Sequence, residues 1–200
     1  MLDRWSARGY SERMETAERL YTADEFLERN WEDHRWEELI DGRLVLIEPK
    51  FPHQLACTRI VGALMRWSEE DERGFGIATI ALDLRIDDRN VLAPDALWYA
   101  DAAHIGHDAP AQLLPPQLVV EVRSPSTWTR DRGVKRERYE AWGARELWLV
   151  DTRSSTVIVH RRADRAAPAF DDPFEVGPND ALRSPMLPGF ELAAQRLFAI

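Results

Sequence analysis

The stretch Leu118-Val119-Val120-Glu121-Val122-Arg123 decides the fold, because it is an apolar run with a single acid inside it. Its apolar residues point to both faces of a sheet, which is the pattern of a buried central strand. A buried carboxylate is costly unless it is paired or binds a metal. Side chains two apart on a strand share a face, so Glu121 either pairs with Arg123 at the strand end or belongs to a site.

A second acid, Asp95, interrupts a second apolar run over residues 91–98. Pro94 precedes it and cannot donate to a sheet ladder, so we expect an edge or a bulge that presents a functional side chain. Carboxylates on adjacent strands can hold a hard cation such as Mg²⁺ through oxygen and leave room for water and a phosphate. Asp95 and Glu121 together therefore predict a metal site on the sheet.

The other segments predict an α/β or α+β domain built around a mixed central sheet. Thr22 and Glu25 form a capping box that starts a short helix, and Asp41-Gly42 is a hairpin turn inside residues 36–48. We expect further strands over residues 77–86, 91–99, 117–122, 146–151 and 156–161, and helices over 51–70 and 127–142, the latter weakened by Gly133 and closed by Gly143. The tail segment 187–192 is expected to return and cover a sheet edge.

The 200 residues, 44% of them hydrophobic and 30% charged, suit one compact domain. We expect a polar lead-in over residues 1–20 and a single domain over residues 21–200. No apolar stretch approaches the roughly 20 residues that span a bilayer, and the first residues lack a signal peptide's apolar core, so we expect the cytoplasm. The single cysteine, Cys57, permits neither an internal disulfide nor a zinc finger, so oxygen or histidine must supply most ligands of any metal.

The formal charge of −9 argues against a protein that coats nucleic acid without specificity, because neutralising phosphates needs a basic surface. A local basic cleft is still compatible with that charge. Residues 121–139 carry six cations and three anions. Taken alone, such a segment is most often a solvated helix face.

Lysine is rare in this chain, since Lys50 and Lys135 are the two lysines among its 26 cations. Lys135 shares one stripe of the expected helix with Asp131 and Tyr139, because the three are spaced four apart. The ordinary interpretation is a helix ladder in which Asp131 pairs with Lys135. A compact ammonium on a flexible stem can also approach a metal-bound water, whereas an arginine remains a fixed planar cation.

Three further polar residues have structural interpretations that the residues alone favour. Glu38 lies just ahead of the hairpin turn and is expected to face solvent, as its neighbour Glu37 is. His53, near the start of the long helix, is more typical of a surface or capping histidine than of a ligand. Ser124 begins a Ser-Pro-Ser-Thr run that caps the next helix and could also contact phosphate.

The ordered set of motifs resembles the Uma2 (DUF820) family of restriction-endonuclease-like proteins over roughly residues 21–162, with a weaker echo at 187–189. The matching segments are Glu38–Gly42, Pro94-Asp95, Val120–Ser126, Asp131 with Lys135 and Tyr139, Gly143, and Glu146–Asp151. The resemblance implies a PD-(D/E)XK nuclease core, in which a mixed sheet is flanked by helices and the acidic pair lies on two central strands.

The resemblance also implies roles for individual residues. Catalytic roles fall to Asp95, Glu121, Lys135 and Glu38, metal binding to Asp95, Glu121 and the Val122 carbonyl, and substrate binding to Arg123, Ser124, Tyr139 and His53. Arg123 stands where nucleases of this type usually carry lysine, and members of the family commonly lack lysine there. Lys135 would then be the displaced motif lysine, supplied from the helix.

These residues predict a Mg²⁺- or Mn²⁺-dependent DNA endonuclease that hydrolyses phosphodiester bonds. One alternative is a catalytically inactive nuclease-fold module that binds nucleic acid or protein, and another is that the carboxylates only form structural ion pairs. Eight tryptophans and a short sheet leave apolar surface for a homodimer, an arrangement that suits nucleases cutting two strands.

Overall fold

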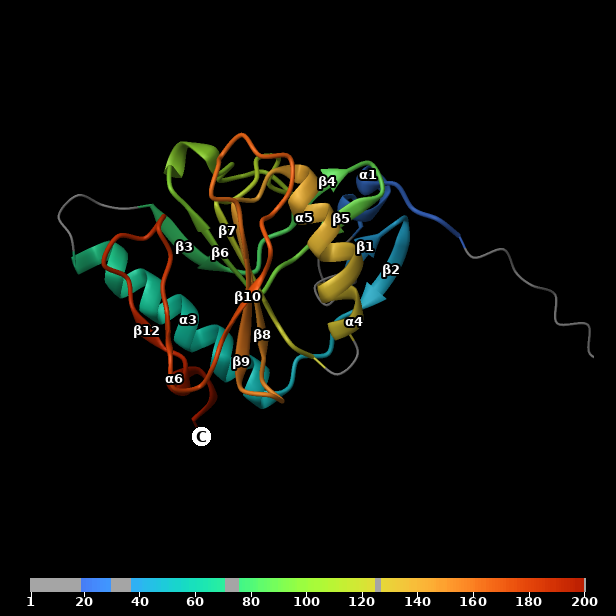
Figure 1. Ribbon diagram of the computed structural model, residues 1–200. Helices are drawn as coiled ribbons and strands as arrows, with labels where there is room; N and C mark the ends of the chain where they lie inside the picture. The colour runs from blue at the N-terminus through green and yellow to red at the C-terminus, as the bar shows by residue number, and fades with distance from the viewer. Residues whose placement is uncertain (1–18, 30–36, 71–75, 125–126, 200) are drawn as a thin grey trace, which may run out of the picture.

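The computed structural model describes residues 19–29, 37–70, 76–124 and 127–199, and its centre is a six-stranded mixed sheet (Figure 1). The strand order is β10-β9-β8-β7-β6-β3, in which β7 runs parallel to β8 and antiparallel to β6. The strands are β3 (Ile77–Ile80), β6 (Ala96–Tyr99), β7 (Leu118–Val122), β8 (Glu146–Asp151), β9 (Thr156–Arg161) and β10 (Phe174–Val176). The strand that carries Glu121 is thus a central one, as the sequence predicts.

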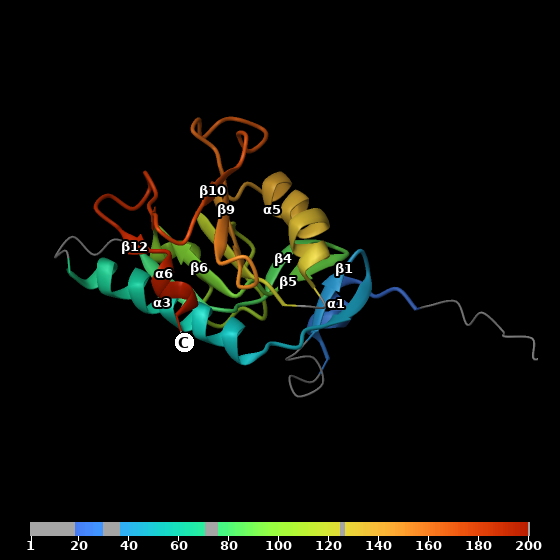
Figure 2. The ribbon, with the colours of Figure 1, turned by 60° about the horizontal axis from the view of Figure 1, so that its bottom comes forward.

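Helices cover both faces of this sheet, which explains why β7 is apolar on both sides. Helix α3 (Phe51–Glu70) packs on the face that presents Val120 and Val122, and helix α5 (Arg136–Trp142) packs on the face that presents Val119. Figure 2 shows the sheet between the two helices. Burying a whole Val or Leu side chain in this way contributes roughly 1.5–3 kcal/mol, so the two helix layers supply much of the stability.

A second sheet of four strands lies beside the first, with the order β2-β1-β5-β4. Its strands are β1 (Glu37–Ile40), β2 (Arg43–Leu46), β4 (Leu84–Asp87) and β5 (Asn90–Leu92). Asp41 and Gly42 join β1 to β2 with φ of 50° and 77°, so the predicted hairpin is confirmed, with positive φ at both turn residues. Helix α1 (Ala23–Leu27), which starts with the predicted capping box, packs Phe26 against Leu39.

The strands expected over 77–86 and 91–99 are each split between the two sheets, so that prediction is wrong. Strands β3 and β6 pair in the large sheet, while β4 and β5 pair in the small one. Pro94 lies at the crossing point between β5 and β6, where its missing N–H interrupts no ladder. Asp95 therefore lies just before β6 rather than inside a long strand.

The helix expected over 127–142 is present but irregular. It consists of α4 (Trp128–Arg130), the π-helical turn η2 (Asp131–Lys135) and α5. Gly133 lies inside η2 with φ of −105° and ψ of −106°, which is not a helical conformation. Gly143 closes α5 in the left-handed conformation at φ of 106°, as predicted. A π turn inserts one residue into a helix and is often found at functional sites.

The C-terminal segment covers a face of the large sheet rather than an edge, which corrects the expectation for residues 187–192. Phe190 stacks on Trp148 of β8 at 6.0 Å and meets the edge of Trp67 of α3 at 6.2 Å. The remaining elements are η1 (Ala102–His104), β11 (Ala181–Leu182), β12 (Leu192–Ala193) and α6 (Gln195–Phe198). None of the helices in the described segments is long and apolar enough to cross a membrane. Most of the predicted lead-in lies outside the described residues.

Candidate active site

One part of the site is a buried ionic cluster around Lys135. The Lys135 Nζ lies 2.6 Å from Glu121 Oε1, 2.8 Å from Glu38 Oε1 and 3.6 Å from Asp131 Oδ1. The side chain of Lys135 is only 3% exposed, and the three acids are buried as well. We call Glu38, Glu121, Asp131, Lys135 and Tyr139 the sealed half of the site.

The irregular helix places two members of the sealed half. Asp131 and Lys135 are the first and last residues of η2, and both side chains are buried toward β7. The Thr127 hydroxyl donates to Asp131 Oδ2 at 2.9 Å, and the Ser124 and Thr127 hydroxyls lie 2.8 Å apart. Ser124 Oγ also accepts from the Thr127 amide at 3.2 Å, but Thr127, the N-cap residue, makes no side-chain capping hydrogen bond, so the predicted cap is absent at that residue.

Glu121 and Glu38 are fixed by donors from other elements. Tyr139 Oη of α5 donates to Glu121 Oε1 at 2.6 Å, and the Ala93 amide donates to Glu38 Oε1 at 2.8 Å. The expectation that Glu38 faces solvent is therefore wrong. The small sheet is covered on both faces, by α1 on one side and by the α5 layer on the other, so its hairpin has no fully solvated face.

The sealed half has more negative than positive charge. Burial opposes the charged form of Lys135, but Glu121, Glu38 and Asp131 outweigh it and hold the pKa of the ammonium well above its usual value. Burial raises the pKa of Glu121 well above 4.5; Lys135 offsets part of this, while Asp131 and Asp95 add to it. Burial also raises the pKa of Glu38. Three carboxylates around one ammonium therefore need a further positive charge, either protons or a cation.

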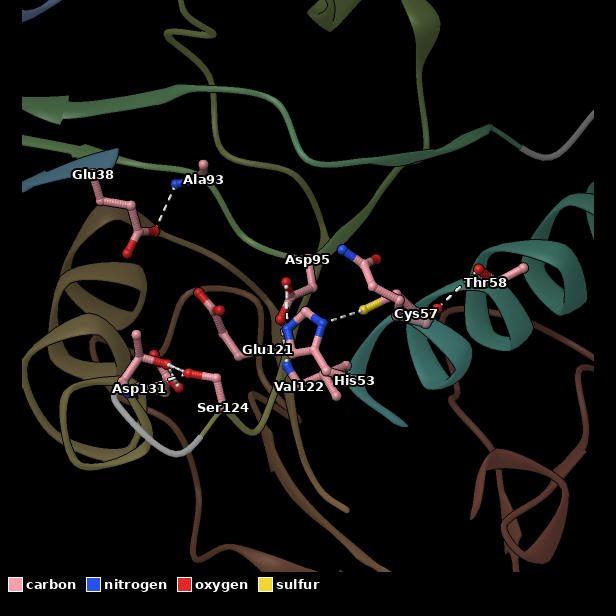
Figure 3. Close-up of polar contacts among 12 residues, drawn as sticks. Glu38, His53, Cys57, Thr58, Ala93, Asp95, Glu121, Val122, Ser124 and Asp131 are labelled. Carbon is pink, nitrogen blue, oxygen red and sulfur yellow. Dashed lines mark hydrogen bonds and ion pairs between the residues drawn. The ribbon is translucent and has the colours of Figure 1, made fainter. Parts of the chain in front are cut away.

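The other part of the site surrounds Asp95 and opens to solvent. Asp95 Oδ2 accepts from the Val122 amide at 2.6 Å, and Asp95 Oδ1 lies 3.0 Å from His53 Nε2 (Figure 3). The Cys57 Sγ lies 3.6 Å from His53 Nδ1. We call His53, Cys57 and Asp95 the open half of the site. All three line a cleft of about 330 Å³, and the Asp95 side chain is 17% exposed.

The open half has a donor set that could hold a metal ion. Ligand atoms of His53, Cys57 and Asp95 all lie within 4.8 Å of one another. His53 is buried against Asp95, so the expectation of a surface or capping histidine is wrong. The sequence reasoning did not assign Cys57 to the site, although its four-residue spacing from His53 on a helix puts both on one side.

Arg123 does not pair with Glu121, which overturns the simple alternative of a pair along the strand. Its guanidinium lies 2.8 Å from Asp151 Oδ2 and 5.5 Å from the centre of the Trp128 ring. Burial works against the charged form of Asp151, but the Arg153 amide and Arg123 outweigh it and lower its pKa. Arg123 is thus a neighbour of the site that is tied to the end of β8.

The mixed sheet lies between helices and carries an acid just before β6, Asp95, and another near the end of β7, Glu121. This arrangement defines the class: a restriction-endonuclease-like nuclease fold. The architecture matches a solved structure described as "Crystal structure of a putative nuclease belonging to DUF820 from Anabaena variabilis" with a TM-score of 0.74. That match has 19% sequence identity and covers 89% of this chain and 97% of the other.

The particular family follows from the sequence comparison. The family model Uma2, described as "Putative restriction endonuclease", matches residues 23–195. The chain therefore belongs to the Uma2 family, and the resemblance drawn from its motifs is confirmed. No curated protein matches the chain.

Proposed function

We propose that this protein is a Mg²⁺- or Mn²⁺-dependent endonuclease that hydrolyses phosphodiester bonds in DNA. The observation that carries the proposal is the charge excess of the sealed half directly beside an accessible carboxylate. Asp95 is close enough to Glu121 to raise its pKa, and Asp95 itself reaches the cleft. A divalent cation shared by these two acids would supply the missing positive charge at a point that a substrate can approach.

The residues that would hold the cation are Asp95 and Glu121, with His53 and the Val122 carbonyl as further candidates. When bound, such a cation polarises a phosphate and lowers the pKa of a water molecule. His53 and the Val122 amide each bind one oxygen of Asp95 and so fix the orientation of its carboxylate. Outer partners of this kind commonly orient metal ligands and tune their basicity.

Lys135 would act through its charge rather than as a base. Its pKa is raised, so the ammonium keeps its proton at neutral pH and can offset negative charge that develops on the phosphate. Glu38 and Asp131 hold it in place. Tyr139 is fully buried and donates to Glu121, so we assign it to positioning Glu121 rather than to contact with phosphate. Substrate contacts of Arg123 and Ser124 stay predictions.

Incubation of the protein with supercoiled plasmid and Mg²⁺ or Mn²⁺ tests this function. We expect nicked and linear products that chelation abolishes. Asp95→Ala should remove cleavage, whereas Asp108→Ala, the same change at an exposed acid, should not. Cleavage that survives Asp95→Ala would sink the proposed mechanism.

A module that binds nucleic acid or protein without turnover is the second candidate. The observation that favours it is the direct contact of 2.6 Å between Lys135 and Glu121, because that ammonium already satisfies the carboxylate. Calorimetric titration with Mn²⁺ separates the two candidates. Specific binding that Glu121→Gln abolishes supports the enzyme, and no specific binding supports the module.

We also propose a homodimer and one domain over residues 21–200, with the cytoplasm as the predicted compartment. Edge strand β3 leaves Ile77 39% and Ile80 62% exposed, and a second copy would cover such apolar surface. Light scattering at several protein concentrations measures the mass. A monomer at all concentrations would contradict the dimer.

A further inference from the structure

A groove beside helix α3 is lined by three arginines for which the described residues offer no acidic partner. It has a volume of about 530 Å³ and lies between α3 and the C-terminal segment. Its walls include Thr58, Arg59, Gly62 and Arg66 from α3, and Leu192 and Arg196 from the other side. We call this the arginine groove, and no acid is among the described residues that line it.

The charges of the arginine groove remain uncompensated within the described part of the chain. Arg59 donates to the backbone carbonyls of Leu197 and Ala199, which do not neutralise it. Arg66 and Arg196 are exposed, and no ion pair to a carboxylate is found for either among the described residues. The nearby acid Glu191, which lines an adjoining hollow, is paired with Arg183 at 2.7 Å.

The basic segment of the sequence, residues 121–139, differs in this respect. Arg123 pairs with Asp151, Arg136 with Glu140, and Arg138 with Asp41. Lys135 is buried in the sealed half. Four of the six cations in that segment are thus paired with acids, and Arg130 and Arg132 are exposed. In a chain of net charge −9, three arginines in one groove without acids are a local exception that suits an anionic partner.

The arginine groove continues from the cleft of the candidate active site. Thr58 lines both hollows, and His53, Gln54 and Cys57 line the cleft one turn earlier in α3. Residues 54, 58, 62 and 66 are spaced four apart, so they follow one side of the helix. The twelve steps from Gln54 to Arg66 span about 18 Å at 1.5 Å per residue. This is about five nucleotides of one strand at roughly 3.4 Å each.

We propose that the arginine groove binds the phosphate backbone of a nucleic acid whose strand enters the cleft at Asp95. Arg66 Nη1 lies 3.6 Å from the position that a Cβ at Gly62 would take, so the Arg66 guanidinium lies over the wall of the groove at Gly62. Arg59 is anchored by its carbonyl contacts, while Arg66 and Arg196 can reach phosphates from opposite walls. The inference rests on the proposed function for its substrate class but concerns binding rather than chemistry.

Fluorescence anisotropy of a labelled DNA duplex in EDTA tests the inference, since no cleavage occurs without metal. The test compares the wild type with Arg66→Gln/Arg196→Gln and with Arg165→Gln. Arg165 is an exposed arginine in the loop after β9, at the end of the molecule away from α6 (Figures 1 and 2). Each lost phosphate contact lowers the slope of log affinity against log salt by about 0.9.

We expect the double variant to bind more weakly, with a slope shallower by about two units, and Arg165→Gln to behave as the wild type. Equal slopes for the double variant and the wild type, or no binding by the wild type, overturn the inference. Competition by polyglutamate as strong as that by DNA would identify an acidic protein as the partner and also overturn it.

The metal-dependent reaction is measured separately with the same proteins. If the slope of the double variant differs from that of the wild type but no protein cleaves DNA, the arginine groove is supported and the proposed nuclease function is contradicted. If the wild type cleaves DNA but the slopes are equal, the nuclease function is supported and the arginine groove is contradicted. Thermal melting checks that both variants are folded, which we expect because Arg66, Arg196 and Arg165 are all exposed.

Discussion

Both halves of the site contain carboxylates, but the two halves differ in their access to water. In the sealed half, three acids and one ammonium are nearly inaccessible, and their contacts are all made within the protein. In the open half, Asp95 is oriented by His53 and the Val122 amide and still reaches a cleft. Under the proposed function, the sealed half would set the charge of the site and the open half would meet the substrate.

The largest effect should come from breaking the sealed half at its centre. Lys135→Met removes the ammonium and leaves three buried carboxylates without it, which should cost about 3–5 kcal/mol of the free energy of unfolding. Urea denaturation measures this loss. His53→Ala, a change in the open half, should cost less, because Asp95 keeps the Val122 amide and access to water.

A double variant checks the reason for that loss. Adding Glu121→Gln to Lys135→Met removes one of the stranded charges and should recover part of the stability. A double variant that is less stable than Lys135→Met alone would mean that unpaired charge is not what destabilises the single variant.

The next effect concerns pH and metal. The pKa of Glu121 and that of Glu38 are raised in the fold, so the folded state keeps protons that the unfolded chain releases near 4.5. Their contribution to stability is therefore full below that pH and falls as pH rises through the folded pKa values. A divalent cation replaces these protons, so the increase in Tm caused by Mn²⁺ should be larger at about pH 8 than at about pH 5.

Differential scanning fluorimetry at both pH values measures this increase. Glu121→Gln is the matched control, since it removes one raised carboxyl and should remove most of the dependence on pH. An equal Mn²⁺ effect at both pH values would contradict a cation bound by the buried acids. The raised pKa of Lys135 adds no competing change here, because its contribution is lost only as pH rises above 10.5.

A smaller effect should follow from loosening one carboxylate. Tyr139→Phe removes the hydroxyl that donates to Glu121 and keeps the ring in the core. Losing this donor raises the pKa of the Glu121 carboxyl further, so Mn²⁺ affinity should fall. We expect a loss of about tenfold, the lower end of the range found when a residue that orients a metal ligand is removed. Calorimetry measures the affinity, and Tyr99→Phe, whose hydroxyl donates to the Leu114 carbonyl, is the control.

The smallest effect on the Mg²⁺ reaction should come from Cys57 in the open half. Sulfur is a poor ligand for Mg²⁺ and a good one for Zn²⁺, so Cys57→Ser should leave Mg²⁺-dependent cleavage nearly unchanged and weaken Zn²⁺ binding about tenfold. Competition between the two metals in the cleavage assay tests this. An equal loss of Mg²⁺-dependent cleavage and of Zn²⁺ binding would show that Cys57 supports the fold of the open half rather than selecting the metal.

Regular elements with strong patterns could be predicted from the sequence. Helix α3 and strands β8 and β9 begin and end at the predicted residues, because long amphipathic or fully apolar segments leave few alternatives. The split of residues 77–99 between two sheets could not be predicted, since the pairing partners of the strands are set by tertiary contacts rather than by their composition. Pro94 indicated that the strand is interrupted, but not that the two parts pair in different sheets.

The residues of the candidate site likewise fall into those that the sequence could predict and those that it could not. An acid inside an apolar strand marked Glu121, and a rare lysine marked Lys135, because both are costly to bury without a partner. Glu38 and His53 carried no such signal. A hairpin acid and a helix-start histidine are ordinary surface residues until packing covers them.

The sequence by itself determined that Glu121 must be paired or bind a cation, that β7 is a central strand, and that the family is Uma2. Local composition suffices for the first two statements, because burial is visible in the apolar residues on either side, and the family followed from the ordered set of motifs. Only the tertiary structure decided that Lys135 meets Glu38, Glu121 and Asp131, and that three arginines of α3 and α6, with no ion pair among the described residues, line one groove. Which charges neutralise one another depends on distances between segments far apart in the chain, and the fold alone sets those distances.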